Sequence, residues 1–319
     1  MSAARPTETG LPAPWLSLAL AAVIWAALWP LQTFEMRVYL LPWMAHIGAH
    51  GPVGVFGHPF SNYTPTYLYV VALASLLATL ISDHGVVKFV SLLGTLWLAW
   101  SIHHLLRVSG APAPARAGAL TLLLPSAIVN AALLGQCDAF WAAACVMAVA
   151  SAIDRRPAAM LLWCGLAFAF KAQAIFLAPF AIAMLIAWRS RWTLWAIPPA
   201  VYLTAMVPAW AAGWPAADLL SVYLRQAGTF DQLSMNAPNL WQLVQAAPGL
   251  DAPIWRSWLW QWPRLARSRS SSPLSACCGR RPRSLRIPCS PSLCCPASSC
   301  PACCRECTTA SSSSRMCSP

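Results

Sequence analysis

Long apolar runs recur along residues 1–262, and they constrain the fold more than any other feature of the chain. Runs of 16–20 residues meet the length that a helix needs to cross about 30 Å of hydrocarbon. Turn-forming or charged stretches separate these runs. We therefore predict an all-α fold, a polytopic transmembrane helical bundle of about eight spans, near residues 14–31, 66–82, 87–106, 117–134, 139–153, 158–170, 174–188 and 193–212.

The composition of the chain changes abruptly after Trp262. All 18 tryptophans lie at or before this residue, whereas residues 263–319 hold ten of the 13 cysteines, nine arginines and long runs of Ser and Pro. A Cys or Ser codon read one nucleotide earlier encodes Leu, Val, Met, Ile or Phe, so an apolar helix read out of frame gives such a tail. We interpret residues 263–319 as a frameshifted, disordered tail. The alternatives are a genuine disordered tail and a disulfide-rich module.

This division predicts three parts. Residues 1–13 form a short cytoplasmic lead, residues 14–262 a truncated transmembrane domain, and residues 263–319 the Ser/Cys/Arg/Pro-rich tail. The apolar segment after the lead has no small-residue cleavage site, so we interpret it as a retained first span and not as a signal peptide. The predicted location is the inner (plasma) membrane, with multiple passes.

The net charge does not indicate a nucleic-acid partner. The chain has a formal charge of +12, but residues 1–262 hold two lysines and ten arginines against eight acids. Most of the excess therefore lies in the tail, and the body has no basic stripe with interleaved aromatic residues. The partner that the composition predicts is the lipid bilayer.

Basic residues indicate which ends of the spans face the cytoplasm. The arginine pairs at 155–156 and 189–191 mark cytoplasmic ends, since positive charge concentrates there. Residues 171–173 then lie at the external end of the hairpin between the two pairs, and so do residues 136–138 by the same count. The stretch 32–65 is external if the N-terminus is inside.

One conflict remains in this topology. Three predicted spans lie between residues 32–65 and Gln136, which places the two on opposite sides of the membrane. Either 66–82 or 87–106 is re-entrant, or the spans are miscounted. We prefer a shared external side.

The segment after the first span carries the first candidate for chemistry. It contains a carboxylate beside a guanidinium, Glu35 and Arg37, and then an aromatic stretch and a Ser-Asn-Tyr-Thr-Pro turn with Asn62 and Tyr63. Charged groups at a helix end are often only topology signals. At a lipid-accessible site, a carboxylate also suits a general base that takes a proton from an acceptor hydroxyl.

The sequence Gly-Gln-Cys-Asp at 135–138 is the second candidate, because it lies at the mouth of a predicted span. Asp138 there is either an N-cap that interacts favourably with the helix dipole, or it joins Gln136 in binding sugar hydroxyls or a metal ion. The sequence leaves both interpretations open.

A lysine in an apolar run is the third candidate. Lys171 and Gln173 belong to Phe-Lys-Ala-Gln-Ala at 170–174. An ionisable residue inside a membrane segment is a functional candidate, although a lysine near a helix end can instead extend its ammonium to the interface. A phosphate is a plausible partner for its point charge. The turn Asn-Ala-Pro-Asn-Leu-Trp at 236–241, with Asn239, is ambiguous alone.

Taken in order, these segments resemble a known family. The runs FSNYTPTYLY, LLGQCDAFWAA, AFAFKAQAIFLAPF and NAPNLWQL are similar to bacterial membrane mannosyltransferase-like proteins related to the eukaryotic GPI mannosyltransferases, within the GT-C superfamily. The resemblance covers roughly residues 14–245. One alternative frame of the tail also permits MHDRFFFLAD, which resembles the late His-aromatic motif of such families.

The resemblance implies a GT-C-like fold and an inverting transfer of a sugar, with mannose as the example, from a polyprenyl-phosphate donor to an acceptor on the non-cytoplasmic side. The family's acid after the first span is usually Asp, so Glu35 departs from the pattern by one methylene. A divalent cation is possible, but no ligand cluster in the sequence requires one. The resemblance implies catalytic roles for Glu35 and Asp138, and substrate contacts for Arg37, Asn62, Tyr63, Gln136, Lys171, Gln173 and Asn239.

Two other functional classes stay open. A transporter or flippase would have inverted repeats around a site at the middle of the membrane, and the sequence has no halves in register. A non-catalytic pseudogene remnant is the third class. Missing spans would leave apolar helix faces without partners, so we expect the chain as written to be unstable or inactive; full activity of the 319-residue product would contradict this.

Resequencing the gene across the codons for Trp255 to Ser275 tests the frameshift. We expect a single-base insertion or deletion in that interval, after which the corrected frame continues as apolar spans and regains a His-aromatic motif. An unchanged sequence would make this chain the product of a pseudogene, in which the candidate residues record an ancestral site.

Overall fold

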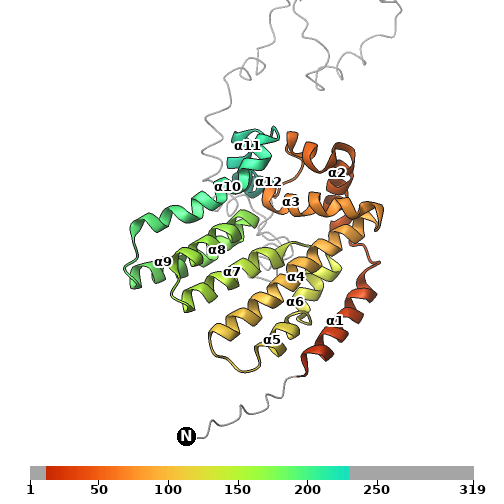
Figure 1. Ribbon diagram of the computed structural model, residues 1–319. Helices are drawn as coiled ribbons and strands as arrows, with labels where there is room; N and C mark the ends of the chain where they lie inside the picture. Colours follow the sequence, from red (N-terminus) through yellow and green to blue (C-terminus); the bar gives the residue numbers. More distant parts are fainter. Residues whose placement is uncertain (1–11, 230–319) are drawn as a thin grey trace, which may run out of the picture. The chain divides into compact units, whose positions relative to one another are not determined.

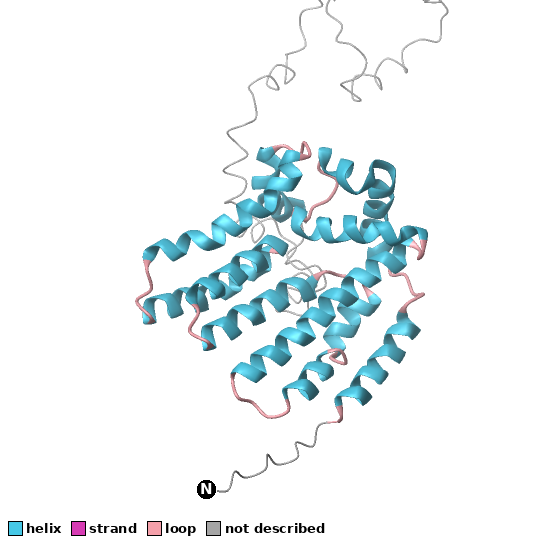
Figure 2. Ribbon diagram, in the orientation of Figure 1, coloured by secondary structure: helices cyan, strands magenta, loops and turns pink. Residues whose placement is uncertain are grey.

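The computed structural model describes residues 12–229, and within this range it is helical with no strand (Figure 2). The predicted all-α fold is therefore confirmed. Short π-helical or 3-10 segments adjoin several of the helices, notably Met36–Leu40, Ser75–Thr79, Ile128–Leu133, Ala172–Leu177 and Trp192–Ala196. The α-helices are α1 Pro14–Leu28, α2 Leu41–Gly54, α3 Pro65–Ala74, α4 Asp83–Val108, α5 Pro114–Thr121, α6 Pro125–Ala127, α7 Asp138–Ile153, α8 Pro157–Phe170, α9 Ala178–Ala187, α10 Ile197–Ala211, α11 Ala216–Leu220 and α12 Val222–Thr229.

Most of the long helices lie side by side in one bundle. The chain runs up and down this bundle, so several of its connecting segments meet at the same end. The turns from α4 to α5, from α7 to α8 and from α9 to α10 all lie at one end of the bundle (Figure 1). The segments before α4, before α7 and after α8 lie at the opposite end, together with α2, α3, α11 and α12. We call this second end the site end.

Small residues let the helices approach closely. A Cβ atom added at Gly94 of α4 would lie 2.7 Å from the ring of Phe140 in α7. A Cβ atom at Gly165 of α8 would lie 2.9 Å from Pro198 Cα and Val201 Cβ in α10. Close approach at small residues is the usual way in which helices associate in membranes, where apolar burial adds little between them.

The helix α3 does not cross the bundle, although residues 66–82 were predicted to form a span. Thr64, just before α3, donates a hydrogen bond from Oγ1 to the Ala169 carbonyl at the end of α8 (2.6 Å). Val87, in the first turns of α4, lies against Gly135 in the turn before α7. Both ends of this segment therefore lie at the site end, and α3 runs across that end (Figure 1). The topological conflict disappears, because residues 32–65 and Gln136 share one end.

A buried lysine joins α1 to α4. Lys88 is fully buried (0 % exposed), and its ammonium donates a hydrogen bond to the carbonyl of Leu28, the last residue of α1. The last carbonyls of a helix have no partner within the helix, and the Leu28 carbonyl accepts from this lysine and from the Leu31 N–H at 3.2 Å. This contact fixes the end of α1 beside the start of α4.

Helix length supports fewer membrane spans than the eight predicted. In the described range, the stretches Asp83–Val108 and Trp192–Ala211 are long and apolar enough to cross a membrane. A third is reached if Pro114–Thr121 and Pro125–Leu133, which are bent by 40°, count as one span. The remaining apolar helices have only 10–17 residues. Association with a membrane is compatible with these helices, whereas a multi-pass topology is not established by their length.

Packing of the turn before α7 can be tested at Gly135. This residue has φ +71°, and a Cβ atom there would lie 2.8 Å from Met36 Cε and 2.9 Å from Val87 Cγ1. Gly110 has φ +72° but no atom within 4 Å of an added Cβ, so Gly110→Ala is a matched control. Both substitutions incur the left-handed backbone cost of roughly 1–2 kcal/mol. Gly135→Ala costs a further ~1–3 kcal/mol of stability, because the added methyl overpacks the site against Val87, whose branched side chain is stiff.

We therefore expect Gly135→Ala to lower the apparent Tm of the detergent-solubilised protein more than Gly110→Ala does. Heating followed by size-exclusion chromatography measures the two shifts. Equal shifts would contradict the packing of this turn against the start of α4.

Candidate functional site

A cavity of about 570 Å³ opens at the site end of the bundle, between segments that connect the helices. Six of its lining residues were predicted from the sequence as site residues: Glu35, Asn62, Tyr63, Gln136, Lys171 and Gln173. Its other lining residues are Phe34, Tyr39, Leu40, Trp43 and Gln226. The fold thus brings together polar residues from five separate parts of the sequence.

Asp138 lies beside this cavity as the first residue of α7, and its carboxylate accepts three hydrogen bonds. Oδ1 accepts from Lys171 Nζ at 2.5 Å and from Trp141 Nε1 at 2.9 Å, and Oδ2 accepts from Asn130 Nδ2 at 2.6 Å. The N-cap position belongs to Cys137, which makes no side-chain cap. Asp138 is therefore the centre of a polar network and not a helix cap.

The electrostatics of the network keep this carboxylate ionised. Asp138 precedes the predicted span 139–153 and is not part of it. Burial alone would raise the pKa of its carboxyl, but the Lys171 ammonium and the hydrogen bonds from Lys171, Trp141 and Asn130 outweigh burial and lower the pKa below its usual value. The interaction with an opposite charge and the donation of hydrogen bonds both favour the charged form.

Lys171 reaches the cavity because α8 ends immediately before it. Its backbone is extended (φ −156°, ψ 139°), and its side chain is 13 % exposed. The ammonium lies 2.5 Å from Asp138 Oδ1 and 5.7 Å from the centroid of the Tyr63 ring. The lysine therefore pairs with an acid beside the cavity instead of extending into an interface. An ammonium has three N–H donors, so this pair leaves capacity for an anionic ligand.

Tyr63 and Gln136 connect the turn before α3 to the turn before α7. The Tyr63 hydroxyl donates to Gln136 Oε1 at 3.3 Å, and Gln136 is 8 % exposed. Burial, with smaller contributions from Cys137 and Asp138, raises the pKa of the Tyr63 phenol well above its usual value, so it remains a protonated donor. Its ring and the Trp43 ring pack edge to face, with 5.2 Å between the ring centroids.

The remaining predicted residues are placed less closely together. Glu35 is exposed and lines the cavity at the start of the π-helical segment Met36–Leu40. Arg37 is also exposed, does not line the cavity, and donates to the Gln32 carbonyl at 3.1 Å. Asn239 lies outside the described residues.

No cluster of metal-ligating side chains is found at this site in the described residues. Within residues 12–229, no three His, Cys, Asp or Glu side chains are grouped so that they could hold a metal ion. The Asp138 oxygens accept from three donors, one of them an ammonium. A cation would have to displace that ammonium, so we derive no chemical step that uses one.

Sequence reasoning missed three polar contributors: Asn130, Trp141 and Gln226. Asn130 interrupts the apolar run 117–134, which is a signal of the same kind as Lys171. Trp141 is one of 18 tryptophans and carries no signal in such a chain. Gln226 lies far along the sequence, in α12, and only the fold brings it to the cavity.

The ion pair can be tested with a double-mutant cycle of Asp138→Asn and Lys171→Met. Each single substitution leaves a partly buried charge without its partner, so we expect each to lower the apparent Tm and the double variant to lose less than the sum. Coupling energies of contacting residues are about 0.5–3 kcal/mol. The measurement is thermal unfolding in detergent, and additive losses would contradict the coupling.

A second ion pair supplies the control for this cycle. Asp218 and Arg225 form a salt bridge whose side chains are 32 % and 45 % exposed. Surface pairs contribute roughly 0–1 kcal/mol. We expect the corresponding cycle of Asp218→Asn and Arg225→Gln to give the smaller coupling.

Comparison with known proteins adds no relative. The chain matches no family model, no curated protein and no solved structure. The case for a function therefore rests on the cavity and on the side chains that surround it.

Proposed function

We propose that the protein is a polytopic GT-C-like membrane glycosyltransferase, which transfers a hexose such as mannose from a polyprenyl-phosphate donor to an acceptor on the non-cytoplasmic face. One observation carries the proposal: a single cavity collects a carboxylate, an ammonium and four amides, from Glu35, Lys171, Asn62, Gln136, Gln173 and Gln226. A hexose bound to a phosphate presents hydroxyls and an anion, and these groups match that set.

The distribution of arginines supports the orientation. The end of the bundle opposite the cavity carries an arginine in or beside each turn, namely Arg107, Arg116, Arg155, Arg156, Arg189 and Arg191. Positive charge near span ends concentrates on the cytoplasmic side. With these turns in the cytoplasm, the cavity opens to the non-cytoplasmic side of the inner membrane.

Exposed apolar surface supports insertion of the bundle as a multi-pass domain. Only 11 % of the most apolar window in Trp192–Ala211 is buried, and large side chains such as Val207 and Trp210 are exposed. Lipid is the environment that satisfies such a surface, since soluble monomers rarely expose contiguous apolar patches of this kind. A helix shorter than the bilayer core is accommodated by local thinning of the bilayer, at a modest cost per ångström of mismatch.

The proposed reaction is a single displacement with inversion. The Glu35 carboxylate takes the proton of the acceptor hydroxyl, and the hydroxyl oxygen bonds to the anomeric carbon. The bond from that carbon to the phosphate oxygen breaks, and its electron pair stays on the phosphate. Lys171 stabilises the charge that develops there. Asp138 acts through Lys171, because its oxygens are occupied by hydrogen bonds, and it is a positioning residue.

The substitution Glu35→Gln tests the proposal. We expect the variant to bind polyprenyl phosphate as well as the unchanged protein does, and to transfer labelled hexose from polyprenyl-phosphate mannose about 10²–10⁴-fold more slowly, since the general base is lost. Asp83→Asn is the matched control, because Asp83 is an exposed carboxylate at the same end of the bundle that does not line the cavity. Transfer is measured in membranes, with the gene in the frame that resequencing establishes.

Two results would overturn this assignment. Failure of the purified chain to bind polyprenyl phosphate would remove the proposed substrate. Equal transfer by Glu35→Gln and Asp83→Asn would remove Glu35 as the base.

A further inference from the structure

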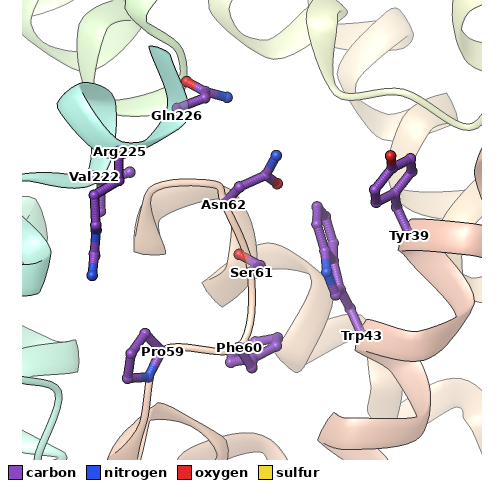
Figure 3. Close-up of a pocket in the computed structure, with 9 residues that line it drawn as sticks. All are labelled: Tyr39, Trp43, Pro59, Phe60, Ser61, Asn62, Val222, Arg225 and Gln226. Atoms are coloured by element: carbon purple, nitrogen blue, oxygen red, sulfur yellow. The ribbon is translucent and has the colours of Figure 1, made fainter. Parts of the chain in front are cut away.

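A second cavity has a volume of about 440 Å³ (Figure 3). The two share four lining residues: Tyr39, Trp43, Asn62 and Gln226. The second cavity is also lined by Pro59, Phe60, Ser61, Val222 and Arg225. Its volume is within the range of about 300–1,000 Å³ that is usual for small-molecule sites.

Aromatic rings held by packing form part of its wall. Tyr39 and Trp43 stand together on one side of the cavity, and Arg225 with Val222 of α12 stands on the other (Figure 3). The Trp43 side chain is fixed, because the residue is only 7 % exposed and packs against Tyr63. Phe60 is stacked on His46, with 4.9 Å between the ring centroids.

The polar groups of this second cavity differ from those of the first. No lysine or carboxylate lines it, and its one guanidinium, on Arg225, pairs with the Asp218 carboxylate. The other polar groups are the Ser61 hydroxyl and the Asn62 and Gln226 amides. Amides and hydroxyls both donate and accept hydrogen bonds, as the hydroxyls of a neutral sugar do. The first cavity, in contrast, has the Lys171 ammonium for an anion.

We propose that the second cavity is the acceptor subsite and binds a hexopyranose ring. The C–H face of the ring packs on the aromatic wall of Tyr39, which is 39 % exposed, and Trp43, and the ring hydroxyls bond to the amides and to Arg225. This inference rests on the proposed function, since it needs a donor in the first cavity. Transfer then takes place at the shared residues, where the acceptor oxygen bonds to the anomeric carbon, its proton passes to Glu35 and the phosphate leaves.

Binding measurements in nanodiscs test the inference, on the protein made from the gene in the frame that resequencing establishes. The probes are methyl α-D-mannopyranoside and octyl α-D-mannopyranoside for the second cavity, and polyprenyl phosphate for the first. We expect Trp43→Leu and Arg225→Gln to weaken mannoside binding, Trp43→Leu by at least about 10-fold, which is about 1.4 kcal/mol. Lys171→Met is the reciprocal control, with weakened phosphate binding and unchanged mannoside binding.

Arg225→Gln keeps the test valid if Trp43→Leu fails to fold, because the Arg225 side chain is 45 % exposed and the residue lines only the second cavity. Tighter binding of the octyl mannoside than of the methyl mannoside would identify a lipid-linked acceptor, and equal binding a free glycan.

Four results would overturn the acceptor subsite. Mannoside affinity unchanged in both second-cavity variants would place the sugar elsewhere, and competition between mannoside and polyprenyl phosphate would place both ligands in one site. Binding of polyprenyl phosphate without any binding of mannoside would remove the subsite while the proposed function stands. Binding of mannoside without polyprenyl phosphate would instead remove the proposed function, and the acceptor assignment with it.

Discussion

The ion pair between Asp138 and Lys171 is the interaction on which the site depends. The two residues lie at the start of α7 and just after the end of α8, and Nζ and Oδ1 are 2.5 Å apart. A partly buried charge is costly unless it is paired and its remaining hydrogen-bonding capacity is satisfied. Asn130 and Trp141 supply the further donors. The network therefore fixes two helix ends, and with them Gln136 and Gln173 two residues away.

The helix α3 gives this arrangement its second support. Its start is held by the Thr64 hydroxyl on the last carbonyls of α8, and Tyr63 reaches Gln136 before α7. Because α3 lies across the end of the bundle, α4 begins at the same end. The positions of Asn62 and Tyr63 in the cavity follow from that course of the chain.

Sequence reasoning identified the polar residues of the cavity more successfully than the path of the chain. Lys171 stands out because a charged group in an apolar run has few reasons to be there, whereas Gln136 and Asn62 lie in short polar segments and were singled out with the help of the family resemblance. The segment 66–82 is as apolar as a true span, so hydropathy cannot separate a helix that crosses a bundle from one that lies across its end. Only tertiary contacts such as Thr64 with Ala169 decide between the two.

The two carboxylates at the site are suited to different tasks. A carboxylate that accepts from an ammonium, an indole and an amide is a weak base, because each donor stabilises its charged form. Asp138 is of this kind. Glu35 is exposed on the cavity wall, and no ion pair to it is found in the described residues. The π-helical segment Met36–Leu40 follows it directly, and such segments frequently occur at functional sites. Tyr39 lies in this π-helical segment and lines both cavities. The exposed Glu35 and this shared aromatic residue therefore come from one local distortion of the helix.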